Sequence, residues 1–74
     1  MDIEARLRKL ESRYRAALSA AVAAKANYLA LAEEPSATPA AVARALALWK
    51  QLEARKREIA AQMGEVEAFE DSMN

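Results

Sequence analysis

The seven residues EEPSATP, at positions 33–39, decide the fold of this chain. Pro35 disfavours the helical conformation at Glu34, so a helix that reaches this point ends there. Thr38 followed by Pro39 is typical of a helix start, with threonine as the N-cap and proline at the first helical position. The stretch therefore indicates a turn between two helices.

The rest of the chain contains no other proline and only one glycine among 74 residues, which is a helical composition. The pattern predicts an all-α fold with a single domain, residues 1–74. Its first helix covers residues 2–33, its turn residues 34–38 and its second helix residues 39–70. At ~1.5 Å per residue each helix is about 45–50 Å long. Two helices of equal length joined by a short turn predict an antiparallel, coiled-coil-like hairpin.

Apolar residues on the second helix alternate three and four apart, which is the heptad spacing of a coiled-coil seam. The positions with this spacing are Val42, Ala45, Trp49, Leu52, Lys56, Ile59, Met63 and Val66. The first helix begins in the same way, with Ile3, Leu7, Leu10 and Tyr14. It then steps by four twice, to Leu18 and Val22, and we expect this stutter to shift the apolar stripe around the helix.

Residues 16–26 contain seven alanines, which shape the middle of the first helix. Alanine is the best helix former, and its small side chain lets another helix approach closely. The second helix carries the bulky Trp49 and Leu52 at the same level. We therefore expect the alanines to pack beneath these larger side chains with complementary volumes.

Charged residues indicate how the two helices align. Residues 6–15 hold five bases and one acid, whereas residues 58–71 hold five acids and no base. If the turn is centred near residue 36 or 37, facing residues have numbers that add to about 73. This register predicts that Arg8 lies near Glu65 and Arg15 near Glu58, each exposed pair contributing ~0–1 kcal/mol.

Two lysines, Lys25 and Lys56, lie on the apolar lines of the two helices. One interpretation is that both extend past the alanines into water. The other is that they are functional cations, because a polar residue in a seam reduces stability but specifies the partner or the register. The sequence leaves both interpretations open.

No arrangement of residues indicates catalysis or a bound cofactor. The chain has no cysteine and no histidine, so the usual zinc ligands are missing. Ser12, Ser19 and Thr38 have no neighbouring base that would activate them as nucleophiles. We therefore predict a protein that is not an enzyme and has no cofactor and no metal site.

The alanine-rich segment is also too short and too charged for a membrane span or a secretion signal. Its longest uncharged run, residues 16–24, is followed by Lys25, whereas a span needs ~20 mostly apolar residues. Acids and bases both precede it, unlike the short basic start of a signal peptide. We expect no membrane partner and a cytoplasmic location.

The width of the apolar stripe predicts a protein partner, because two helices in a hairpin cover only one flank of each other. We expect the interface to be formed by Val42, Leu46, Trp49, Leu52, Leu18, Val22 and Tyr28. The simplest way to cover this surface is a two-fold dimer that makes a four-helix bundle. The predicted function is a self-associating structural or adaptor piece, with another helical protein as the alternative partner.

Nucleic acid is a less favoured partner, because the formal net charge of the chain is zero. The basic run at residues 6–15 nevertheless keeps an RNA-binding hairpin dimer as a further alternative.

Two short motifs resemble those of the small helical-hairpin co-chaperones of type III secretion needle subunits. The motifs are Pro39-Ala40-Ala41-Val42 at the start of the second helix and Leu52-Glu53 about ten residues on. Val42 stands where that family usually has an aromatic residue. The resemblance implies a cytoplasmic protein that docks beside a helical-repeat chaperone and helps to keep a needle subunit from polymerising.

Overall fold

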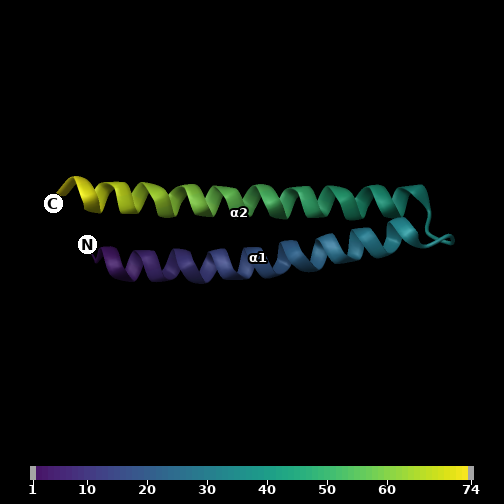
Figure 1. Ribbon diagram of the computed structural model, residues 1–74, viewed down its shortest axis with the longest axis horizontal. Helices are drawn as coiled ribbons and strands as arrows, with labels where there is room; N and C mark the ends of the chain where they lie inside the picture. Colours follow the sequence, from purple (N-terminus) through teal and green to yellow (C-terminus); the bar gives the residue numbers. More distant parts are fainter. Residues whose placement is uncertain (1, 74) are drawn as a thin grey trace.

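Two antiparallel helices form the protein, as Figure 1 shows. A computed structural model describes residues 2–73, with side chains described as far as residue 68. Helix α1 runs Ile3–Glu33 and helix α2 runs Pro39–Met73, and together they make a rod of 58 × 15 × 14 Å. The start of α1 and the end of α2 lie at the same end of the rod, opposite the turn. The predicted all-α hairpin is confirmed.

A side chain caps the N-terminus of each helix. The carboxylate of Asp2 accepts a hydrogen bond from the backbone N–H of Ala5 at 3.2 Å. The hydroxyl oxygen of Thr38 accepts one from the N–H of Ala41 at 3.1 Å, so threonine is the N-cap of α2 as the sequence indicates. At its far end α2 continues to Met73, three residues beyond the expected end.

The turn between the helices is held by Glu34. Its backbone is extended and its N–H donates to the carbonyl of Leu31 at 3.1 Å. Its side chain accepts hydrogen bonds from both the hydroxyl and the backbone N–H of Ser36, at 2.9 Å and 3.3 Å. Pro35 keeps α1 from continuing, and these bonds direct the chain towards α2.

The buried side of α1 follows one uninterrupted heptad line. Its buried residues are Leu10, Ala17, Ala21 and Ala24. Ile3, Leu7, Tyr14, Tyr28 and Leu31 are half-buried on the same line. The predicted stutter is wrong: Leu18 and Val22 are 38% and 61% exposed, so they lie beside the seam and not in it. The seam passes through the alanines because α2 supplies the bulk opposite them.

The buried side of α2 is the one that the heptad spacing predicts. Ala45, Ile59 and Val66 are buried, and the remaining positions of the line are half-buried. Lys56, in the middle of this line, keeps 22% of its side chain exposed. Ala21 is fully buried, which fits the prediction that the alanine segment packs closely against α2.

Contacts between the helices define their register. Leu10 shares a hollow with Gln62, Arg13 shares another with Ile59, and the Tyr28 ring stacks on the Trp49 ring. The residue numbers of the stacked pair add to 77, about one helical turn from the predicted value of about 73.

The predicted ion pairs do not form in this register. Among the described side chains, no ion pair joins Arg8 to Glu65 or Arg15 to Glu58. Each arginine follows a seam residue of α1 by one position, whereas each glutamate precedes a seam residue of α2. In an antiparallel hairpin these two flanks lie on opposite faces, so residues at the same height point to different sides.

Within the described residues, neither helix contains a stretch that is long and apolar enough to cross a membrane.

Candidate protein-interaction surface

A line of exposed apolar side chains runs along one flank of α1. It consists of Leu18, Val22 and Leu29, which are 38%, 61% and 48% exposed. Each follows a seam residue by one position, so all three lie on the same side of the helix. We call this surface the α1 apolar flank. Large apolar side chains that share one exposed line are typical of an interaction surface.

The structure divides the predicted interface residues into two groups. Leu18 and Val22 belong to the exposed flank, whereas the others are half-buried within the hairpin itself. The half-buried residues are Val42, Leu46, Trp49, Leu52 and Tyr28. Of these, only Leu46 lies beside the seam, one position after Ala45, and therefore on the same face of the hairpin as the α1 apolar flank. The other four mainly hold the two helices together.

Two other leucines, Leu29 and Leu48, are also exposed. Leu29 extends the α1 apolar flank, and the signal for it is its spacing of seven residues from Val22. Leu48 is also 48% exposed, but it precedes the seam residue Trp49 and therefore lies on the opposite face of the hairpin. The sequence does not distinguish these two faces unless the seam of each helix is known.

Aromatic and cationic side chains meet where α1 approaches the turn. The rings of Tyr28 and Trp49 stack with their centroids 5.7 Å apart and an angle of 24° between their planes. The ammonium group of Lys25 lies 5.7 Å from the centroid of the Trp49 ring, a distance typical of a cation–π contact. Lys25 thus joins the seam to the exposed flank on which Leu18 and Val22 lie.

The indole N–H of Trp49 is buried without a hydrogen-bond partner among the described residues. It lies close enough to the Glu53 carboxylate to favour the charged form of that group, and so to lower its pKa, although the geometry does not reach that of a hydrogen bond. A buried donor left unpaired is unfavourable, so this N–H lowers the stability of the contact between the two helices.

Glu53 also pairs with the seam lysine. The Lys56 ammonium lies 3.0 Å from the Glu53 carboxylate, one turn away on the same helix. The hydrogen bond from Lys56 is the main cause that holds the pKa of the Glu53 carboxyl below its ordinary value of 4.5. Lys56 therefore reaches out of the seam to an acid on its own helix, which favours the structural interpretation of this lysine.

In the described part of the chain, no three residues of the types His, Cys, Asp and Glu gather as metal ligands would.

Comparison with protein-family models, with curated proteins and with solved structures finds no match for this chain.

Proposed function

We propose that this protein is a non-catalytic interaction module, a helical hairpin that associates with a second copy of itself as a structural or adaptor piece. The observation that carries the proposal is the α1 apolar flank, Leu18, Val22 and Leu29, which the hairpin leaves exposed. Full burial of one Leu or Val side chain contributes ~1.5–3 kcal/mol. In a two-fold dimer both copies bury the same side chains, so each of the three contributes twice.

Charges on the same flank favour a second copy as the partner. Glu11 and Lys25 lie seven residues on either side of Leu18, and both are exposed. If two α1 helices cross antiparallel with the two-fold axis at Leu18, Lys25 of each copy lies beside the partner's Glu11. The surface is then complementary to itself, as a two-fold interface must be. Two hairpins joined in this way form a four-helix bundle.

Limited stability of an isolated hairpin also supports association. The described core of the hairpin contains only Leu10, Ile59 and Val66 as large buried side chains, and four alanines fill its other buried positions. Small alanine side chains bury little apolar area, so the gain from packing is modest against the entropy of ordering two long helices. Association would bury the apolar side chains of the flank, which the isolated hairpin leaves exposed.

Sedimentation equilibrium tests the proposal directly. We expect a dimer, and a melting temperature that rises over about a hundredfold increase in concentration, because the folded state is the associated one. Val22→Lys should shift the protein to monomer, since it places a charge in the middle of the flank. Ala23→Lys is the matched control, because Ala23 is exposed on α1 but precedes the seam residue Ala24 and so lies away from both the seam and the flank.

A charge exchange tests the antiparallel crossing. Lys25→Glu should weaken the dimer by placing an acid beside the partner's Glu11, and the added change Glu11→Lys should restore it. A protein that remains monomeric at every concentration would refute self-association and leave a different helical protein as the occupant of the flank. The proposal includes the cytoplasmic location expected from the sequence, which fractionation of the native cell tests.

A further inference from the structure

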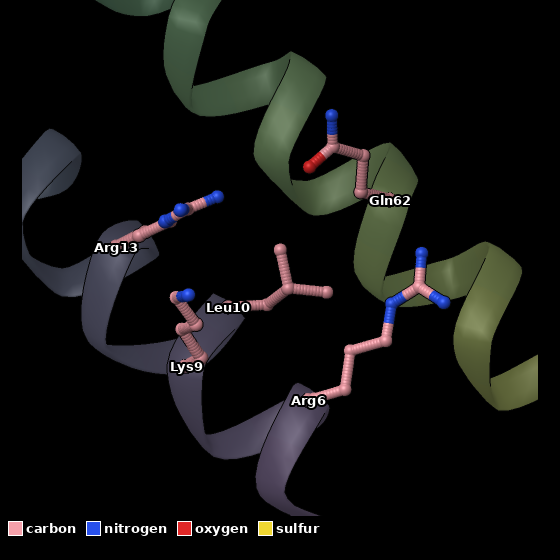
Figure 2. A pocket seen from close by; sticks show the side chains of 5 residues that line it. All are labelled: Arg6, Lys9, Leu10, Arg13 and Gln62. Atoms are coloured by element: carbon pink, nitrogen blue, oxygen red, sulfur yellow. The ribbon is translucent and has the colours of Figure 1, made fainter. Parts of the chain in front are cut away.

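A basic groove lies on the other face of the hairpin, near the start of α1. Figure 2 shows its first part, a hollow of about 240 Å³ lined by Arg6, Lys9, Leu10 and Arg13 of α1 and by Gln62 of α2. All of these α1 side chains come from the first half of the helix, where bases predominate.

A second hollow of about 390 Å³ adjoins the first and shares Arg13 and Gln62 with it. Its other lining residues are Arg55, Glu58 and Ile59 of α2. The two hollows form one groove between the helices. Its apolar floor consists mainly of the aliphatic stems of the lining Arg and Lys side chains, because the core residues Leu10 and Ile59 below them are only 6% and 7% exposed. Its rim carries the cations Arg6, Lys9, Arg13 and Arg55, and among the described lining residues Glu58 is the one acid.

We propose that this basic groove binds an acidic amphipathic helix of a partner protein. The groove between two packed helices receives a third helix in the usual helix-in-groove manner, with apolar anchors against the floor. Lys9 and Arg13 are four residues apart, which is ~6 Å along a helix. Acidic residues four apart on the bound helix have the same spacing, so they pair with both cations, while apolar residues beside them contact the aliphatic stems of the side chains that line the groove.

The groove suits a helix better than it suits nucleic acid. None of the described residues that line it is aromatic, whereas proteins that hold single-stranded nucleic acid stack bases on aromatic rings. The apolar floor has no counterpart in a phosphate backbone but matches the apolar face of a helix.

This groove is independent of the surface proposed for self-association. Lys9 and Arg13 each precede a seam residue of α1, whereas Leu18 and Val22 each follow one. The two surfaces therefore lie on opposite faces of the hairpin, and the groove stays open when two hairpins join through the α1 apolar flank. A dimer would present one groove on each outer side, which is the arrangement of an adaptor.

Binding of a defined peptide tests the proposal. The probe is a fluorescent helical peptide of about three heptads, with leucine at the a and d positions and glutamate at the e and g positions. Its affinity for the intact protein is measured by fluorescence anisotropy. A peptide in which lysine replaces every glutamate is the control ligand, and single-stranded RNA is the competing class. We expect the acidic peptide to bind, and neither the basic peptide nor the RNA.

Two double variants with the same change of charge locate the site. Lys9→Glu with Arg13→Glu alters the groove, and Arg8→Glu with Arg15→Glu alters the opposite flank of the same helix. We expect the groove variant to weaken binding about tenfold or more and the control to change it less than about twofold. Circular dichroism checks that each variant is folded, and Lys9→Gln with Arg13→Gln provides a milder pair if charge reversal unfolds the protein.

Three results would overturn the proposal. They are no binding of the acidic peptide, equal weakening by both double variants, and binding of RNA at the groove in place of the peptide. Sedimentation equilibrium of the same variants distinguishes a failure of this proposal from a failure of the proposed self-association, since the groove variants should dimerise as the native protein does.

Discussion

Tyr28 and Trp49 stack across the hairpin with their ring centroids 5.7 Å apart, and Lys25 lies over the same Trp49 ring. This contact joins α1 to α2 at the end of the rod where large buried side chains are scarce, because the nearby seam residues Ala21, Ala24 and Ala45 are small. The stacked pair therefore supplies much of the apolar contact in this half of the hairpin.

Replacing Trp49 tests the role of this stack. Trp49→Ala should destabilise the hairpin by about 2 kcal/mol, less than for a fully buried tryptophan because the side chain is half-buried. Trp49→Phe should stay within about 1 kcal/mol of the native protein, because it keeps a ring against Tyr28 and removes the unpaired N–H. Urea unfolding followed by circular dichroism measures both changes. Equal losses for the two variants would show that the stacked ring is not what matters.

A second prediction concerns the alanine seam. Ala21 has no exposed surface, so Ala21→Leu should force the helices apart and destabilise the hairpin by about 1–3 kcal/mol. Ala26→Leu, an identical change at an exposed position of the same helix, should alter stability by less than about 0.5 kcal/mol. Thermal unfolding at one protein concentration compares them. If Ala21→Leu melts at or above the native temperature, the alanines do not mark a close contact.

The sequence predicts the hairpin and the seam of α2 well, because each rests on a strong local signal. Pro35, Thr38 and Pro39 specify the turn, and bulky side chains mark the α2 seam against polar neighbours. In α1 the signal disappears between Tyr14 and Tyr28, since alanines occupy the seam and the larger Leu18 and Val22 lie on its flank. Only packing against α2 decides which alanines are buried, so the pattern of larger residues leads to Leu18 and Val22 instead.

The interaction surfaces are less predictable because each depends on both helices. Complementary charge blocks indicate how far along the hairpin two residues lie from the turn. They do not indicate on which face of the hairpin each residue lies. Arg8 and Glu65 show the difference, since Arg8 follows a seam residue of α1 and Glu65 precedes one of α2, which places them on opposite faces. The basic groove is hidden in the sequence for the same reason, because its rim combines Arg13 of α1 with Arg55 of α2.

Gly64 provides a third prediction. A Cβ atom at this position would meet nothing within 4 Å, and the residue lies within α2 without a positive φ angle. Gly64→Ala should therefore stabilise the protein by about 0.5–1 kcal/mol, because alanine loses less backbone entropy on folding. The reverse change at a nearby exposed site, Ala61→Gly, should cost a similar amount. A decrease in stability for Gly64→Ala would mean that another molecule approaches the helix closely there.

The last prediction concerns pH and the ion pair between Glu53 and Lys56. Lys56 lowers the pKa of Glu53 in the folded protein below the ordinary value of 4.5. Stability from this pair is therefore present above that value and is lost as the pH falls through the lower folded pKa. A double-mutant cycle of Glu53→Gln and Lys56→Gln, measured by urea unfolding, should show favourable coupling at about pH 7 that weakens as the pH falls below about 4. The two side chains still reach water, with 22% and 27% of their surface exposed, so the coupling is small and several replicate measurements are needed at each pH. Coupling of the same size in acid would mean that the charge on Glu53 does not contribute, and that the two side chains interact only through packing of their apolar stems.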